Sequence, residues 1–184
     1  MMNREEIVLA GFGGQGIILA GYIVGQAAAI HDRKNATFTQ DYGPEARGSA
    51  CRAQVVISDV PVSYPFVENP SVMLVMSQEA YTRYTPSLDK DALLVVDNSM
   101  VKTEESGEKK IFAIPATAMA KEIGSANVAN IIMLGFLTAI SSIVSADAAR
   151  KSMLTSVPKG TEERNLKAFE QGYRYGLSQP GQKD

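Results

Sequence analysis

The chain has 184 residues, a formal net charge of −2 and 45% hydrophobic residues, which is typical of a globular protein with one domain. This charge, without a Lys- or Arg-rich block, argues against a nucleic-acid partner. A single cysteine, Cys51, excludes an internal disulfide and an iron–sulfur or Cys-rich zinc site held by this chain alone. One histidine, His31, argues equally against a His-based metal site. We therefore expect no metal or cofactor bound by this chain alone.

No segment predicts a membrane span. The most apolar stretch, 128–144, is short for a span, contains Asn130 and Ser142, and has no basic residues at its flanks. We interpret it as a helix buried in the protein. The N-terminal residues 1–6 are polar and lead into a strand, which differs from a cleavable apolar segment. We expect a cytoplasmic protein.

A glycine cluster follows the first apolar run of the chain. Residues 7–10 predict a strand, residues 11–16 (Gly-Phe-Gly-Gly-Gln-Gly) a tight turn, and residues 17–30 a helix that is apolar on nearly every side. The free N–H groups at the start of such a helix can hold an anion. The turn therefore supplies the first candidate ligand-binding residues, which are Gly13, Gly14, Gln15 and Gly16.

Strands and helices alternate along the rest of the chain. Strands are predicted over 36–40, 50–58, 72–76, 92–97 and 110–114. Helices are predicted over 78–84, 116–123, 128–144, 146–156 and 161–177. This alternation predicts an α/β fold, with a Rossmann-like, largely parallel sheet, helices on both faces and a helical C-terminal part. We expect a single domain over residues 1–177 and a disordered tail over 178–184.

Loops with polar residues follow several of these strands. They are the glycine turn and the segments 41–49, 77–79 and 97–99. In a parallel sheet ligands bind beyond the carboxyl ends of the strands, so we expect these loops to converge on one edge. Arg47, with Gly48 beside it, is suited to clamp a carboxylate or a phosphate. Alternatively, Arg47 pairs with Glu45 or caps a helix.

Other polar residues have structural interpretations. Cys51 lies in a predicted strand with no histidine nearby in sequence, which favours a buried structural thiol over a nucleophile. Asn127 and Asn130 flank the start of the apolar helix 128–144, where they cap it or present an amide to a partner. No Ser/His/Asp set stands out, so we expect no catalytic residue in this chain.

The glycine turn satisfies the G-x-G-x-x-G pattern of dinucleotide-binding proteins, but the supporting acidic residue is missing. Asp32 precedes the second predicted strand, and Asp41 begins a long Gly/Pro loop after it. The chain also lacks the GxxxxGK[ST] pattern of P-loop NTPases. A free-standing Rossmann-type nucleotide-binding protein remains an alternative.

Six segments, in order along the chain, resemble the gamma subunit of 2-oxoacid:ferredoxin oxidoreductases. They are 11–16, 42–48 (Tyr-Gly-Pro-Glu-Ala-Arg-Gly), 75–81, 114–117, 130–135 and 165–169. Segments 42–48 and 77–81 are most similar to the 2-oxoglutarate type. Two positions depart from the family: Ser49 replaces a second Gly after Arg-Gly, and Ser71 replaces an Asp. The first departure bears on how closely a ligand approaches the loop.

The resemblance implies a division of labour among subunits. Alpha and beta subunits hold thiamine diphosphate and Mg, and iron–sulfur clusters lie in beta or in a ferredoxin-like delta subunit. The complex converts a 2-oxoacid, CoA and oxidised ferredoxin to acyl-CoA, CO2 and reduced ferredoxin. The gamma subunit packs against its partners and helps to receive CoA or substrate. Its implied contacts are Gly13, Gly14, Gln15, Gly16, Arg47 and Gly48.

Three further expectations concern the activity and the partners of the chain. The isolated chain is inactive, and self-association of that isolated chain is an open alternative to a monomer. We expect neither a membrane nor a nucleic acid as a partner. A related indolepyruvate oxidoreductase subunit is a second interpretation of the same segments.

Overall fold

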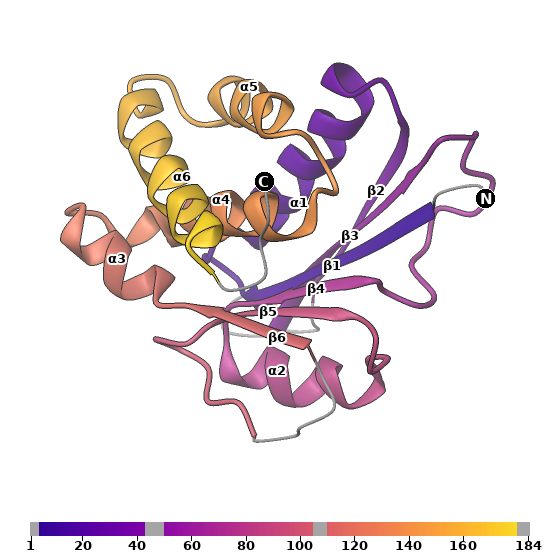
Figure 1. The fold of residues 1–184 in the computed structure, drawn as a ribbon, viewed down its shortest axis with the longest axis horizontal. Helices are drawn as coiled ribbons and strands as arrows, with labels where there is room; N and C mark the ends of the chain where they lie inside the picture. Colours follow the sequence, from indigo (N-terminus) through magenta and orange to yellow (C-terminus); the bar gives the residue numbers. More distant parts are fainter. Residues whose placement is uncertain (1–3, 43–49, 105–109, 180–184) are drawn as a thin grey trace.

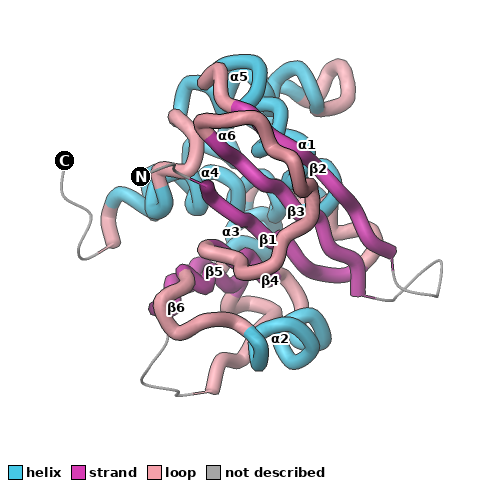
Figure 2. The backbone as a smooth tube through the Cα atoms, turned by 90° about the vertical axis from the view of Figure 1, so that its right-hand side faces the viewer, coloured by secondary structure: helices cyan, strands magenta, loops and turns pink. Residues whose placement is uncertain are grey.

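A computed structural model describes residues 4–42, 50–104 and 110–179. Its centre is a six-stranded sheet with the strand order β2-β3-β1-β4-β5-β6 (Figures 1 and 2). The strands are β1 (Arg4–Phe12), β2 (Asn35–Tyr42), β3 (Ala50–Ser58), β4 (Val72–Val75), β5 (Leu93–Asp97) and β6 (Lys110–Ile114). The α-helices are α1 (Ile17–Gln26), α2 (Gln78–Tyr84), α3 (Ala116–Glu122), α4 (Ala129–Ser141), α5 (Ala146–Ser156) and α6 (Glu162–Leu177).

Short helical segments complete these elements. A π-helical turn, η1 (Ala27–His31), continues α1, which confirms the long first helix. The 3-10 segments η2 (Thr85–Ser87) and η3 (Ala126–Val128) follow α2 and precede α4. No helix in the described ranges is long and apolar enough to cross a membrane. The predicted disorder of the tail stays a prediction, because residues 180–184 lie outside the described residues.

The sheet is largely parallel, as predicted, with one reversed strand. β1, β4, β5 and β6 pair in parallel, whereas β3 runs antiparallel to both β1 and β2. Only residues 43–49 separate β2 from β3, and a parallel crossover needs about a dozen residues or more. These two strands therefore pair directly, and β3 lies between β1 and β2.

Helices cover both faces of the sheet, again as predicted. α2 lies on one face, while α1 and α3 to α6 lie on the other (Figure 1). Alternate strand residues point to the two layers: Ile7 and Leu9 belong to the larger core under α1 and α4, and Val8 and Ala10 to the smaller core under α2. β1, the strand that leads into the turn before α1, is thus packed on both faces.

The central helix is α4. Its residues 129–139 are all buried, and it contacts both the sheet and α6. This confirms a buried helix within the predicted range 128–144, but the predicted end is wrong. The helix stops at Ser141 because Ser142 adopts a left-handed backbone conformation with φ of 51°.

α4 and α6 touch through glycines. A Cβ atom at Gly172 would collide with the carbonyl oxygen of Ile132, and one at Gly135 would collide with that of Phe169. The two backbones therefore pack directly against each other, and the absence of side chains at these positions is what permits it.

We expect Gly172→Ala to lower the free energy of unfolding by about 2–3 kcal/mol, because the methyl group must push two buried backbones apart. Urea unfolding of the purified chain measures this change. Lys167→Ala, at an exposed position of the same helix, is the control and should leave stability nearly unchanged. Equal unfolding free energies for the two variants would contradict the close contact.

Candidate functional site

The carboxyl ends of β1, β2, β4 and β5 lie on one edge of the sheet, together with the start of β3. Phe12 pairs with Ala50, and Tyr42 pairs with Cys51, so the ends of β1 and β2 lie level with the start of β3. The registers of β4 with β1 and of β5 with β4 bring their carboxyl ends to the same edge. The expected convergence is therefore confirmed for the described strand ends. Arg47 and Gly48 lie outside the described residues, so their place in the site stays a prediction.

The glycine turn ends in a left-handed residue. Gly16 has φ of 74° and ψ of 23° and occupies the N-cap position of α1. The helix begins without a side-chain cap, so the N–H groups of its first turn have no partner within the helix. They are available to an anion, as the sequence predicted.

Gln15 supports the turn from within. Its Oε1 accepts a hydrogen bond from the backbone N–H of Phe12 at 2.7 Å, and its Nε2 donates to the carbonyl of Met76 at 2.9 Å. The amide thus joins the ends of β1 and β4. Of the predicted contact residues, Gln15 has its side chain engaged inside the protein, whereas a Cβ atom at Gly13 would meet no heavy atom within 4 Å.

We expect Gln15→Met to lower the free energy of unfolding by about 1–3 kcal/mol, because the N–H of Phe12 and the carbonyl of Met76 lose their partner. Thermal or urea unfolding measures the loss. Gln40→Met, at an exposed position of β2, is the matched control. A loss in Gln15→Met no larger than in the control would show that the two hydrogen bonds do not hold the turn.

Asn130 joins the turn to α4. Its side chain is 3% exposed, and its Nδ2 donates to the carbonyl of Gly16 at 3.1 Å. Its Oδ1 is buried and has no hydrogen-bond partner among the described residues. The helix-capping interpretation of Asn130 is wrong, because α4 begins at Ala129 and the amide bonds to the N-cap of α1 instead.

Open space lies on both sides of the turn. One cavity of about 230 Å³ is bordered by Gly14, Gln15, Met76, Met100 and Thr117, among others. A second, of about 240 Å³, is bordered by Gly14, Gly16, Asn127, Asn130 and Arg164, among others. Sequence reasoning missed Arg164. This residue lies in the charged first turn of α6, and nothing in the sequence of that turn indicates that it faces the glycine turn.

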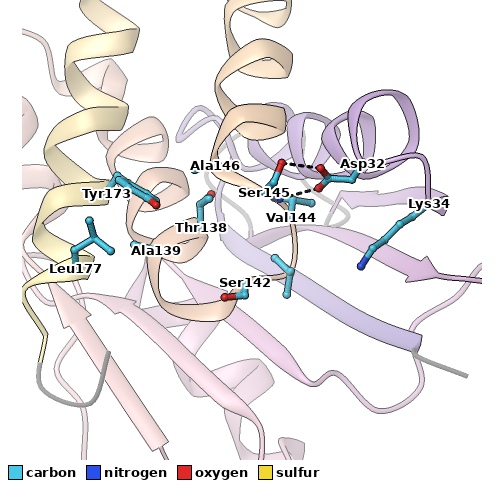
Figure 3. Close-up of a pocket in the computed structure, with 11 residues that line it drawn as sticks. Asp32, Lys34, Thr138, Ala139, Ser142, Val144, Ser145, Ala146, Tyr173 and Leu177 are labelled. Carbon is cyan, nitrogen blue, oxygen red and sulfur yellow. Dashed lines mark hydrogen bonds between the residues drawn. The ribbon is translucent and has the colours of Figure 1, made fainter. Parts of the chain in front are cut away.

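Neither acidic candidate for a dinucleotide site lies at the turn. Asp32 precedes β2 and accepts hydrogen bonds from the N–H and Oγ of Ser145, at 2.7 and 2.6 Å. Figure 3 shows this pair beside a cavity of about 550 Å³, which Lys34 and Tyr173 also border. Since β2 runs in the same direction as β1, this place is at the opposite edge of the sheet from the turn.

The second acidic candidate is Asp41, which pairs with Arg52 at 3.2 Å near the carboxyl end of β2. β3 separates that strand from β1, so Asp41 is two strand spacings, roughly 10 Å, from the strand that carries the turn. A ribose held at the glycine turn would find no neighbouring carboxylate on an adjacent parallel strand. This geometry disfavours the dinucleotide interpretation.

The remaining polar candidates have structural roles. Cys51 is 4% exposed, and burial raises the pKa of its thiol above the ordinary value, which confirms a structural thiol. Asp97 is fully buried at the end of β5, where its carboxylate accepts hydrogen bonds from the N–H and Oγ1 of Thr117 and the N–H of Ser99. Within the described ranges, no group of three His, Cys, Asp or Glu residues is arranged to hold a metal ion.

Comparison with known proteins identifies relatives along nearly the whole chain. Residues 6–175 match the family model described as pyruvate ferredoxin/flavodoxin oxidoreductase. The chain is 50% identical to 2-oxoglutarate synthase subunit KorC of Methanocaldococcus jannaschii, with 92% of each chain covered. It is 34% identical to the subunit of the same name from Archaeoglobus fulgidus, over 95% of this chain and 90% of the relative.

Solved structures agree with this result. A keto/oxoacid ferredoxin oxidoreductase gamma subunit from Geobacter sulfurreducens superimposes with a TM-score of 0.87 at 39% identity, covering 96% of this chain and 98% of that one. A 2-oxoglutarate:ferredoxin oxidoreductase from Magnetococcus marinus superimposes with a TM-score of 0.84 at 22% identity, which shows the shared fold. The match covers 98% of this chain but 32% of the Magnetococcus chain, so there the fold is part of a longer polypeptide.

Proposed function

This chain belongs to the pyruvate ferredoxin/flavodoxin oxidoreductase family, as a gamma-type subunit, and we propose that it serves in a complex of the 2-oxoglutarate type. The observation that carries this proposal is the 50% identity to a 2-oxoglutarate synthase subunit over 92% of both chains. The reaction is the conversion of 2-oxoglutarate or a related 2-oxoacid, with CoA and oxidised ferredoxin, to acyl-CoA, CO2 and reduced ferredoxin.

In this proposal the chain is a non-catalytic subunit. One cysteine does not fit an iron–sulfur cluster, which is held by several thiolates, so the clusters belong to the beta or delta subunit. The alpha and beta subunits carry thiamine diphosphate and Mg. Residues 1–177 act as one domain that packs against these cytoplasmic partners, and the isolated chain is inactive.

The glycine turn is the part of this chain that we assign to ligand positioning. Gly13 and Gly14 leave open space beside the turn, and the N–H groups that follow Gly16 at the start of α1 have no partner within the helix, which suits the phosphate groups of CoA or a 2-oxoacid carboxylate. Arg47 and Gly48, from the segment 43–49 that follows β2 in the sequence, are the other residues that we assign to this site. Gln15 contributes by holding the turn.

We expect the native chain to co-purify with a thiamine-diphosphate-binding partner and a cluster-bearing partner. Affinity purification from the source cells, followed by mass spectrometry and iron analysis, tests this expectation. A chain that elutes alone under gentle conditions would contradict the proposal. Micromolar binding of NAD(P)H or FAD to that isolated chain would favour the alternative, a free-standing nucleotide-binding protein.

We expect Gly13→Ala and Arg47→Ala to raise the apparent KM of the assembled complex for CoA or the 2-oxoacid, with kcat little changed. Loss of a charge-assisted hydrogen bond at Arg47 corresponds to about a tenfold increase or more. Steady-state kinetics measure both constants, and Arg83→Ala, on the exposed surface of α2, is the control. Unchanged kinetics for Arg47→Ala would leave that residue a structural role only.

The identity of the 2-oxoacid is tested on the whole complex. We expect 2-oxoglutarate to be the preferred substrate when pyruvate, 2-oxoisovalerate and indolepyruvate are assayed in parallel. A preference for indolepyruvate would support the second interpretation of the sequence segments.

A further inference from the structure

Three helices begin around the cavity of about 240 Å³ beside the glycine turn. Gly16 precedes α1, Asn127 precedes α4, and Thr161 precedes α6, and all three residues border this cavity. The helices have 10, 13 and 16 residues, and in the described chain none of them has a side-chain hydrogen bond at its N-cap. The positive ends of three helix dipoles therefore meet in one place. At α1 and α6 the first N–H groups have no partner within the helix, whereas at α4 the N–H of Ala129 donates to the carbonyl of Ala126 in η3.

A cationic side chain adds to this field. Arg164, in the first turn of α6, borders the cavity and is exposed to solvent. The acidic residues of that turn, Glu162 and Glu163, are not among the residues that border it. A guanidinium group supplies donors in a planar fork, which suits the oxygens of a phosphate or carboxylate.

The side chain of Asn130 is a second, independent indication of a ligand in this cavity. It borders the same cavity and is 3% exposed, and its Oδ1 has no hydrogen-bond partner among the described residues. Since its Nδ2 is committed to the carbonyl of Gly16, the orientation of the amide is fixed. An unpaired buried acceptor is unfavourable, so a ligand that brings a hydrogen-bond donor into the cavity gains from pairing with it.

We propose that this cavity binds a phosphate group that carries a hydrogen-bond donor, either its own P–OH or a donor attached beside it. The phosphate oxygens accept from the helix N–H groups and Arg164, and the donor pairs with Oδ1 of Asn130. The proposal of a phosphate site rests on the geometry alone. The assignment of its ligand to CoA, which has both phosphates and amides, rests on the proposed function.

The test compares hydrogen phosphate with sulfate, because both are small oxyanions but only phosphate keeps a proton to donate near neutral pH. Each anion is titrated into the full-length chain at constant ionic strength, and ¹⁵N–¹H amide shifts are followed. We expect the first-turn amides of α1, α4 and α6 to move together, and phosphate to bind more tightly than sulfate. Shifts that miss these three turns, or equal affinities for the two anions, would overturn the proposal.

Variants assign the effect to residues. Arg164→Gln should weaken phosphate binding about tenfold, whereas Arg174→Gln, further along the same helix, should leave it unchanged. Asn130→Leu removes the unpaired acceptor and should abolish the preference for phosphate over sulfate. If that buried substitution prevents folding, the Arg164 and Arg174 pair still decides, and equal binding by these two variants would contradict the site.

Competition separates this inference from the proposed function. Displacement of phosphate by CoA supports the deeper assignment, and failure of CoA to compete overturns the assignment to CoA. A chain that binds phosphate as described but purifies without partner subunits contradicts the proposed function alone. A chain that joins the complex but shows no response at the three first turns contradicts this inference alone.

Discussion

The contact between Gly16 and Asn130 is the constraint on which the site depends. A side chain at Gly16 would collide with the Asn130 amide, and the left-handed backbone there suits only glycine well. Because α4 is buried along most of its length, this hydrogen bond joins the start of α1 to a helix in the core. The direct contact of α4 with α6 then connects this hydrogen bond to the helix that carries Arg164.

The reversed strand β3 decides which ligands the glycine turn suits. β3 lies between β1 and β2 in the sheet. A dinucleotide-binding fold instead places its second parallel strand directly beside the first on this side. The turn and the uncapped start of α1 match the first part of that arrangement, whereas no parallel strand of the described sheet lies next to β1 on this side to carry a carboxylate for a ribose. A literal match to the glycine pattern is therefore compatible with a different ligand.

Much of the fold follows from local patterns in the sequence. The alternation of apolar strands and helices predicted the sheet and its layers. Each short apolar run is long enough for a strand but too short for a helix. The end of α4 was predicted three residues too late, since the left-handed turn at Ser142 leaves no glycine or proline signal. The reversal of β3 depends on the length of one connection and not on the composition of the strand.

The site was harder to predict than the fold. The glycine turn is visible in sequence because glycine has a conformational signature, but Asn130 and Gly16 are 114 residues apart. Asn130 resembled a helix cap, and Gln15 resembled a ligand contact, because an amide in a polar loop gives no indication of which distant carbonyl it bonds. Only the packing of α4 against the sheet brings these partners together.

The outer strand of the sheet has a consequence for contacts between copies of the chain. β2 lies at the margin of the described sheet (Figure 2), and nearby Tyr22 and Ile30 are 47% and 65% exposed. An open strand edge next to exposed apolar side chains favours aggregation between copies. A chain with such an edge is prone to associate with other copies of itself while the edge stays uncovered.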